Sequence, residues 1–440
     1  MAHDRPLRVL VLAYYFPPMG LSGVQRIAKL VKYLPENGVD VTVLTVHPGA
    51  YFAFDETLEA EVNASGATIV RTRSLDPTQW MGGRRTVGLP AESRRSRLSR
   101  AAEWIFQPDN KIGWYPFAVK EGRRILDRTP HDLIYATAPP YTSLLVGAHL
   151  ARACSLPLVL DFRDDWVGNP RHTYPTEWHK QFAVRMEGRV LEQAERIHVV
   201  NRLIGDQLAT RHPGASDRIF VVPQGFDPDD FASDVHAQSS VETRDDHLPD
   251  ATCTFLYSGI FYDVQRPDVF LRAFAAACAA SPAFRRDARA RFAGLVPPHM
   301  DRLVGELGIA PQVEVLGYLD HDAVVRNQLD ADVLWMTIGR RVGSEGISTG
   351  KLYEYLGAGK PILGLVPEGV ARETLEASGI GYVCDPDSVE EVAAMLLRLF
   401  GLWQEHRLPG PAPATFLETY NRCEQARQMA HIFQSLVPFT

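Results

Sequence analysis

Cysteine is scarce in this 440-residue sequence, and its spacing argues against two kinds of small site. The five cysteines are odd in number and far apart, and no two of them form a C-x-x-C pair. Disulfide frameworks and zinc knuckles both depend on closely spaced cysteines. We therefore expect all five to be reduced core residues of a cytosolic protein.

Long apolar runs are also missing. No stretch of the sequence reaches 18 apolar residues, and Met1 is followed by polar residues and then directly by an apolar segment. This pattern predicts neither a signal peptide nor a membrane span, so we expect a cytoplasmic protein whose contact with the inner face of the membrane is at most peripheral. The net charge is -7 and the 46 basic residues are spread along the chain, so no nucleic-acid partner is expected.

Two well-known catalytic motifs are absent. The sequence contains no H-E-x-x-H and no G-x-x-x-x-G-K-[ST]. A zinc protease and a P-loop enzyme are therefore not indicated. We expect no metal and no cofactor.

Strands and helices alternate along the chain in two sets, as is typical of parallel sheets covered on both faces. Expected strands of the first set lie at 7–12, 39–45, 68–71, 133–137, 158–162, 196–200 and 219–222. Those of the second set lie at 254–257, 291–293, 313–316, 333–337, 362–365 and 381–383. A polar stretch from about 233 to 250 separates them. The predicted fold class is α/β, with two Rossmann-like, doubly wound domains facing each other.

A dinucleotide-binding dehydrogenase would begin with a similar β-α-β unit, but its fingerprint does not fit. Gly20 and Gly23 do not form G-x-G-x-x-G, and residues 45–47 offer no acid at the end of the second strand.

Residues 344–363 contain the clearest candidate site. A Gly-rich loop ends in Ser348 and Thr349, either of which could cap the short helix that follows. Unpaired N-H groups and the positive end of the helix dipole suit a phosphate or diphosphate, and Lys351 adds a full charge. Glu354 shares a helix face with Lys351 and could accept hydrogen bonds from a diol such as a ribose. Together, Lys351 and Glu354 indicate a nucleotide-sugar site. A surface ion pair above an ordinary capped helix would look the same in the sequence.

Five segments, in their order and spacing, resemble the retaining GT-B glycosyltransferases of family four. They are residues 15–26, 137–140, 161–166, 223–227 and 351–361. The resemblance implies an acceptor domain at 1–235, joined by a last helix at 415–440, and a donor domain at 250–414. It also implies a metal-independent retaining transferase that moves a hexose-type sugar from a nucleoside diphosphate to a hydroxyl.

The resemblance further implies which residues contact the donor. Glu354 matches a glutamate that binds the ribose, and a second glutamate eight positions earlier would fall on Gly346. Glu345 stands one residue before it and would reach the sugar through a one-residue bulge. The implied donor contacts are Gly23, Gly259, Gly317, Tyr318, Glu345, Gly346, Ile347, Ser348, Thr349, Lys351, Leu352 and Glu354.

Charged residues are given catalytic roles by the same resemblance. Arg266 and Lys351 would neutralise the departing diphosphate. Arg163 would occupy the place of a family histidine that faces the donor, and Asp164 would orient it or accept the acceptor's proton. Alternatives stay open: Arg266 as a surface residue, Tyr318 as rim packing, and Arg163 as an ion pair with Asp161 that braces its loop. Tyr15, Gly20 and Arg26 are expected on the acceptor side.

Partners follow from these assignments. We expect a nucleotide-sugar donor, with UDP before GDP, and a glycan, lipid-linked or small-molecule acceptor in bacterial glycan or glycolipid biosynthesis. Two alternatives are a nucleotide-sugar epimerase of the same architecture and an inactive nucleotide-sugar-binding partner of another transferase. Asp227-Pro228-Asp229 imitates the D-x-D motif of metal-dependent transferases, but its place beside Pro223 and Gly225 predicts a turn.

One departure from the alternating pattern concerns membranes. Arginines are frequent between Arg84 and Arg100, and Trp104, Ile105 and Phe106 follow. Cations beside bulky apolar groups suit an anionic membrane surface, so the stretch from Arg84 to Phe106 predicts a peripheral contact. The alternative is a solvated loop with the tryptophan in the core.

Overall fold

The computed structural model describes residues 5–20, 22–51, 54–76, 85–86, 104, 106–169, 172, 174–232, 252–261 and 265–437. The chain divides into two compact units. The first unit comprises Met1–Pro223 and Arg422–Thr440, and the second comprises Gln224–Asn421.

The first unit is built on a seven-stranded parallel sheet of order β4-β2-β1-β6-β7-β8-β9. Its strands are β1 (Leu7–Leu12), β2 (Val39–Val46), β4 (Thr68–Thr72), β6 (Leu133–Ala138), β7 (Leu158–Phe162), β8 (Arg196–Val199) and β9 (Ile219–Val221). In β1, Leu10 and Leu12 join one apolar cluster while Val9 and Val11 join another, so the sheet is covered on both faces. Two short strands, β3 (Ala50–Tyr51) and β5 (Arg85–Thr86), pair separately.

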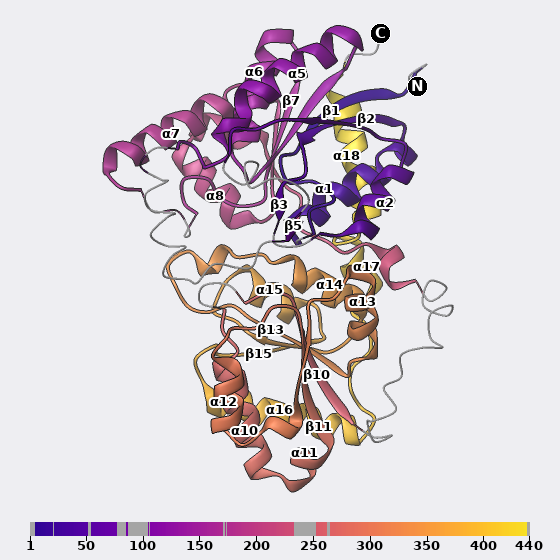
Figure 1. Cartoon of the computed structure of the whole chain (residues 1–440), viewed down its shortest axis with the longest axis vertical. Coiled ribbons are helices and arrows are strands. Elements are labelled where there is room, and N and C mark those ends of the chain that lie inside the picture. Colours follow the sequence, from indigo (N-terminus) through magenta and orange to yellow (C-terminus); the bar gives the residue numbers. More distant parts are fainter. Residues whose placement is uncertain are drawn as a thin grey trace. The chain divides into compact units, whose positions relative to one another are not determined.

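Helices cover both faces of this sheet. They are α1 (Ser22–Tyr33), α2 (Glu56–Ala64), α5 (Tyr115–Arg128), α6 (Thr142–Cys154), α7 (Glu177–Leu191), α8 (Arg202–Arg211) and α18 (Arg422–Leu436). Short 3-10 turns are η1 (Pro35–Asn37), η2 (Ile112–Trp114) and η3 (Pro213–Arg218). The last helix, α18, lies beside α1 and buries Met429 and Phe433 in the same cluster as Val9 and Val11 (Figure 1). The chain therefore returns to its first unit at its end.

The second unit contains a six-stranded parallel sheet of order β12-β11-β10-β13-β14-β15. Its strands are β10 (Cys253–Ser258), β11 (Ala288–Ala293), β12 (Val313–Gly317), β13 (Val333–Thr337), β14 (Ile362–Leu365) and β15 (Gly381–Cys384). With the first sheet, it confirms the predicted fold class of two doubly wound α/β domains.

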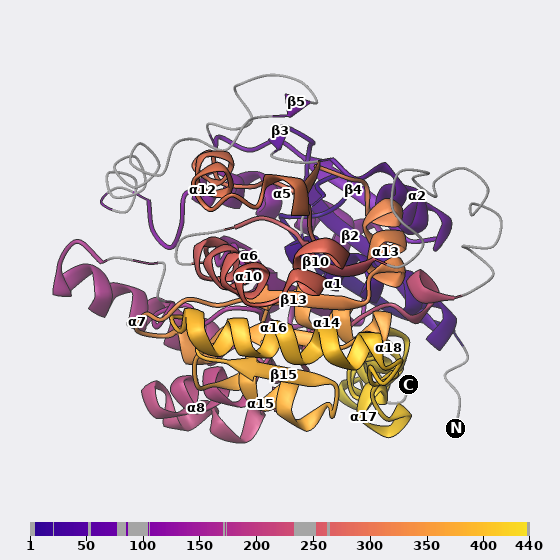
Figure 2. The same ribbon diagram turned by 90° about the horizontal axis from the view of Figure 1, so that it is seen from below.

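Helices again cover this sheet. They are α10 (Asp268–Ala280), α11 (Pro282–Asp287), α12 (Met300–Glu306), α13 (His321–Asp330), α14 (Gly350–Ala358), α15 (Val370–Ala377), α16 (Val389–Gln404) and α17 (Ala414–Glu418). The 3-10 turns are η4 (Pro228–Phe231), η5 (Ala310–Gln312) and η6 (Ser344–Gly346). Figure 2 shows α16 running beside α10, and the Ser388 side chain caps α16 by accepting a hydrogen bond from the Glu391 N-H.

The boundary between the units differs from the predicted limits of 235 and 415. The Phe226 N-H donates to the Tyr420 carbonyl over 2.9 Å, so the start and the end of the second unit are hydrogen-bonded to each other. The rings of Phe226 and Phe231 also pack against Gly357, where a Cβ atom would lie within 2.7 Å of them. Residues 224–232 and α17 therefore belong to the second unit.

The cysteines are free, and Cys253, Cys278 and Cys384 are buried while Cys154 and Cys423 are half-buried. Among the described helices, none is both long and apolar enough to span a bilayer. Most of the predicted membrane contact between Arg84 and Phe106 lies outside the described residues. The described side chains of this stretch are those of Trp104 and Phe106, and both are exposed. The alternative interpretation, in which Trp104 lies in the core, is therefore wrong.

Candidate active site

The strand order of the second unit reverses between β10 and β13. From β10 the chain continues outward to β11 and β12, whereas from β13 it continues in the opposite direction to β14 and β15. The connections that follow β10 and β13 therefore lead toward opposite edges of the sheet. In open α/β sheets, ligands bind at such a reversal of strand order.

Glycines stand at the carboxyl ends of three neighbouring strands beside this reversal. Gly259 follows β10 with φ +123°, Gly294 follows β11 with φ +128°, and Gly317 ends β12 with φ +73°. The Gly259 N-H donates to the Ala293 carbonyl over 2.8 Å, and the Gly294 N-H donates to the Gly317 carbonyl over 2.6 Å. A Cβ atom on Gly294 would lie 2.1 Å from the Gly259 carbonyl oxygen. Only glycine fits at this position, so the three turns pack closely.

The first turn of α14 has no side-chain cap. Thr349 occupies the N-cap position with extended backbone but makes no capping hydrogen bond. Its hydroxyl is buried, without a partner among the described residues, and the Ser348 hydroxyl bonds instead to the Tyr353 hydroxyl over 2.6 Å. Thr349 therefore occupies the N-cap position, as predicted. The prediction that the side chain of Ser348 or Thr349 caps the helix is wrong. Within the part of the chain that the structure describes, no N-cap side chain occupies the first N-H groups of α14, which an anion could therefore use.

Lys351 connects this helix start to the end of β10. Its Nζ lies 3.7 Å from the ring centroid of Tyr257, and a Cβ atom on Gly259 would lie 3.2 Å from its Cε. Burial lowers the pKa of Lys351 to about 7, and the nearby charge of Glu354 opposes this shift. In the described part of the chain, no carboxylate forms an ion pair with Lys351. A cation held by an aromatic face in this way is available to an anion.

Tyr355 fixes α14 against the sheet. Its hydroxyl accepts a hydrogen bond from the Ser258 N-H over 2.8 Å, and the amide of Gln328 donates to the Ser258 hydroxyl over 3.0 Å. This role of Tyr355 was not predicted from the sequence. The available signal was its hydroxyl, because a buried tyrosine needs a polar partner.

The remaining donor residues predicted in this unit differ in exposure. Glu354 is half-buried on α14, and Gly346 and Ile347 are half-buried just before the helix. Glu345 is exposed on η6, and a Cβ atom on Gly369 would lie 2.5 Å from its Cα, so its backbone is packed closely. Leu352 is fully buried and its N-H donates to the Thr349 carbonyl, so its side chain is a core residue rather than a donor contact.

Two further predicted residues lie at the ends of loops in this unit. Tyr318, directly after β12, is exposed. Arg266 is exposed just before α10, which agrees with its description as a helix-start surface residue and leaves its guanidinium accessible to solvent.

In the first unit, Arg163 links the end of β6 to the first turn of α1. Its Nε donates to the Ala138 carbonyl over 3.1 Å, and its two terminal nitrogens donate to the carbonyls of Gly23 and Pro139. Burial lowers the pKa of Arg163. The predicted contact with a donor would require the guanidinium to leave these carbonyls. Asp164, beside it, is half-buried.

The alternative in which Arg163 forms an ion pair with Asp161 is wrong, because Asp161 has a different partner. Asp161 pairs instead with Arg26 over 2.9 Å, and Arg26 also donates to the carbonyls of Val222 and Pro223. Arg26 is only 6% exposed, so it acts as an internal brace and not as a group presented to an acceptor. Gly20 is buried against Asp55, Tyr15 is half-buried, and Gly23 is exposed.

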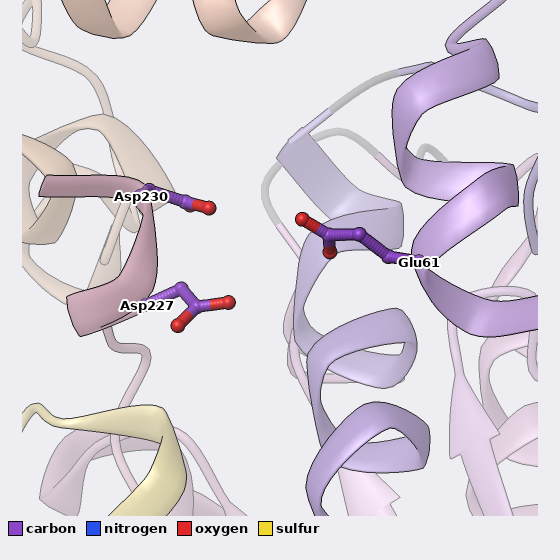
Figure 3. Close-up of side chains that lie close together, drawn as sticks. All are labelled: Glu61, Asp227 and Asp230. Atoms are coloured by element: carbon purple, nitrogen blue, oxygen red, sulfur yellow. The ribbon is translucent and has the colours of Figure 1, made fainter. Parts of the chain in front are cut away.

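The D-x-D-like segment forms the expected turn. The Asp227 carboxylate accepts a hydrogen bond from the Asp229 N-H over 3.1 Å, and Asp230 pairs with His321 over 2.9 Å. Figure 3 shows the side chains of Asp227, directly before the turn η4, and of Asp230 within it. The figure also labels Glu61, which belongs to the first unit. Glu61 pairs with Lys29 over 2.8 Å. Each carboxylate therefore has a partner within its own unit.

Comparison with known families identifies the family to which the chain belongs. The family described as "Glycosyl transferase 4-like domain" matches residues 23–225, and the family described as "Glycosyl transferases group 1" matches residues 242–407. The chain belongs to the family-four-like GT-B glycosyltransferases. The two matches fall on the two α/β units and agree with the resemblance noted in the sequence. No curated protein matches this glycosyltransferase in sequence.

Solved structures support the fold of the glycosyltransferase. Anabaena Alr3699/HepE, solved with UDP and glucose, is 16% identical, with a TM-score of 0.61 over 98% of this chain and 100% of that chain. Sucrose-phosphate synthase from Thermosynechococcus elongatus is 16% identical, with a TM-score of 0.63 over 98% and 99%. A putative UDP-N-acetylglucosamine 2-epimerase from Listeria monocytogenes is 12% identical, with a TM-score of 0.56 over 98% and 96%. At these identities the likeness concerns the fold alone.

Proposed function

We propose that the glycosyltransferase binds a nucleoside diphosphate sugar at the carboxyl edge of the second unit. The observation that carries the proposal is the position of the Lys351 ammonium, which lies beside Gly259 at the reversal of strand order and above the ring of Tyr257. The diphosphate would receive hydrogen bonds from the uncapped start of α14 and charge from Lys351. Glu354, one turn further along the helix, would accept hydrogen bonds from the ribose.

We further propose that a hexose is transferred to a hydroxyl with retention of its anomeric configuration. The bond between the anomeric carbon and the diphosphate oxygen breaks, and a bond to the acceptor oxygen forms on the same face. The acceptor's proton passes to the departing diphosphate, so no protein nucleophile is required. Lys351, the start of α14 and Arg266 stabilise the charge that develops on the leaving group. A bound divalent cation is not needed, and chelation by EDTA should leave turnover unchanged.

UDP is the proposed carrier because the HepE structure was solved with UDP and glucose. A thermal-shift screen against UDP-, GDP-, ADP- and dTDP-sugars tests the donor assignment, since a ligand that binds the folded state raises its melting temperature. We expect the largest rise with a UDP-sugar. If none of the four classes raises the melting temperature, the donor site is wrong.

The acceptor we propose is a hydroxyl of a glycan or lipid-linked glycan in bacterial surface biosynthesis, at the inner face of the membrane. A panel of such acceptors, incubated with the donor chosen by the thermal screen, should give one glycosylated product. Nucleotide binding without turnover on any acceptor would instead favour an inactive partner of another transferase.

An epimerase is the second candidate, favoured by the structural likeness to the Listeria protein. An epimerase would convert a UDP-sugar to its epimer without an acceptor, whereas a transferase alone gives at most slow hydrolysis. Analysis of the sugar after incubation without acceptor separates the two activities.

A further inference from the structure

The outward face of α7 carries aromatic and cationic side chains in one stripe. At about 100° per residue, Trp178, Phe182, Arg185 and Arg189 fall within about 60° of one another around the helix axis. Trp178 is 64% exposed and stacks on Phe182 with ring centroids 5.6 Å apart, and both arginines are exposed. Figures 1 and 2 both show the N-terminal part of α7 extending outward from the other helices of the first unit.

The inner face of α7 is fully anchored without these residues. Ala183, Val190 and Leu191 are buried in the core of the first unit. Glu187 is buried as well and pairs with Arg211 over 3.0 Å and with His212 over 2.8 Å. The helix therefore does not need Trp178 for packing. Exposed aromatic rings that lie side by side on a surface indicate an interaction site.

One more aromatic side chain extends the stripe sideways. Trp104 is 58% exposed, and its ring centroid lies 5.2 Å from that of His179. The ring centroid of Trp178 lies 5.1 Å from the same histidine, so both tryptophans pack against His179. The surface that we call the α7 face comprises Trp104, Trp178, Phe182, Arg185 and Arg189.

The α7 face carries the two exposed guanidinium groups of Arg185 and Arg189. Lys180 is also exposed, but it falls about 140° from Arg185 around the helix axis and lies outside this face. The exposed acid in the first turn of the helix, Glu177, accepts a hydrogen bond from the Gln181 amide over 2.9 Å. Within the described residues, neither Arg185 nor Arg189 forms an ion pair. The guanidinium groups are therefore available to an external anion.

We propose that the α7 face docks on the surface of an anionic phospholipid bilayer. Indole rings settle at the level of the lipid headgroups because one side of them is apolar and the N-H is polar. Guanidinium groups bind phosphate oxygens, and juxtamembrane cations are attracted by the negative surface potential. One exposed face of α7 carries both kinds of group. This surface is distinct from the donor site and does not depend on it.

Sedimentation with vesicles tests the proposal. The full-length protein is mixed with vesicles of phosphatidylcholine containing one quarter phosphatidylglycerol, and with vesicles of phosphatidylcholine alone. We expect binding to the anionic vesicles that weakens with salt, and little binding to the neutral ones. R185Q/R189Q should weaken binding about 25-fold, at about five-fold per arginine near the surface. W178S/F182S should weaken it by a similar factor.

Matched variants on the same unit provide the controls. R124Q/R128Q removes two exposed arginines from α5, and F220S removes a 40% exposed ring from β9. Both should bind anionic vesicles within two-fold of the parent. Equal sedimentation with both kinds of vesicle, no sedimentation at all, or equal losses in R185Q/R189Q and R124Q/R128Q would overturn the proposal.

The two proposals can fail separately. Donor binding in the thermal-shift assay uses no vesicles and should be the same in all four variants, so a failed donor screen leaves the docking result intact. If W178S/F182S does not fold, as judged by its melting curve, the arginine pair and its α5 control decide the question alone.

Discussion

The ammonium of Lys351 lies 3.7 Å from the ring centroid of Tyr257. The ring of Tyr257 holds the ammonium at the end of β10. Among the described residues no carboxylate forms an ion pair with Lys351, so a ligand would not have to displace one. The same contact and the surrounding burial remove water from the ammonium, so the unliganded protein carries a cation that is poorly solvated. A diphosphate would supply the missing counter-charge. Stability and binding are therefore expected to respond to this lysine in opposite directions.

The variant Lys351→Met tests this opposition. Methionine keeps the length and the apolar stem but removes the desolvated charge, so the unliganded protein should melt higher, by about 2 °C or more. Affinity for the nucleotide-sugar should fall by about ten-fold or more because a charge-assisted contact is lost. Lys120→Met, at an exposed position of α5, should change neither quantity. A lower melting temperature together with unchanged affinity would show that the lysine is structural.

Donor affinity should depend on pH through the same lysine. Burial lowers the pKa of Lys351 to about 7 in the unliganded protein, and a bound diphosphate would raise it again. Above pH 7 the free protein is therefore deprotonated at Lys351 while the complex is protonated, so affinity should fall by up to ten-fold per pH unit. Titration calorimetry at pH 8.5 in two buffers of different ionisation enthalpy should show uptake of close to one proton.

Lys351→Arg supplies the control for this titration, because a guanidinium stays charged over the whole range. Its affinity should be nearly independent of pH between 7 and 9, whatever its absolute value. The parent protein should also gain stability as pH rises above 7 when no ligand is present, because the unfolded lysine binds its proton more tightly than the folded one. Equal pH profiles of donor affinity for parent and Lys351→Arg would rule out this lysine as the titrating group.

Much of this architecture can be predicted from the sequence because the strands are short, mostly apolar segments that alternate with helical patterns. The predicted strand at 7–12 coincides with β1, and the predicted strand at 333–337 coincides with β13. The start of α14 is equally local, since the glycines and Thr349 determine it within a few residues. The ribose assignment of Glu354 came from a motif that is contiguous in sequence.

Partners that lie far apart in the chain could not be predicted in the same way. Arg163 donates to the carbonyl of Gly23, which is 140 residues away, because strand order brings the end of β7 close to the start of α1. The sequence shows the charge of Arg163 but not which carbonyls receive it. For the same reason, Tyr257 was seen as part of a strand and not as the support of Lys351. A glycine directly after the strand at 291–293 was a usable signal for the close packing of the strand ends, because Gly294 has no room for a side chain.

Glu354 is expected to recognise the ribose of the donor. Glu354→Ala should weaken binding of UDP by about ten-fold, because a hydrogen bond from a sugar hydroxyl to a carboxylate is lost. The sharper measurement compares UDP with 2′-deoxy-UDP. The parent should prefer UDP, and the variant should bind both equally. Glu376→Ala on α15, where the carboxylate pairs with Arg372 at the surface, should keep the preference. A preference that survives in Glu354→Ala would place the ribose elsewhere.

The buried pair of Arg26 and Asp161 should matter for stability. Asp161→Asn keeps the size of the side chain but leaves the Arg26 guanidinium buried without a counter-charge, which costs about 3–5 kcal/mol. The measurement is the urea midpoint of the transition that unfolds the first unit. Asp206→Asn breaks an exposed pair with Arg202 in the same unit and should cost less than about 1 kcal/mol. Similar losses in both variants would mean that the buried pair is well compensated by water or by carbonyls.

Gly259 should act on donor binding through Lys351. In Gly259→Ala the new Cβ would lie 3.2 Å from the lysine's Cε, at a backbone φ of +123° that alanine rarely adopts. We expect some loss of stability and a fall in donor affinity of about ten-fold, because the ammonium is pushed from its place above Tyr257. A double-mutant cycle separates this effect from general strain. If the glycine acts through the lysine, Gly259→Ala should reduce affinity in the parent and cause little further loss in Lys351→Met. Losses that simply add in the double variant would mean that the glycine contacts the donor with its own backbone.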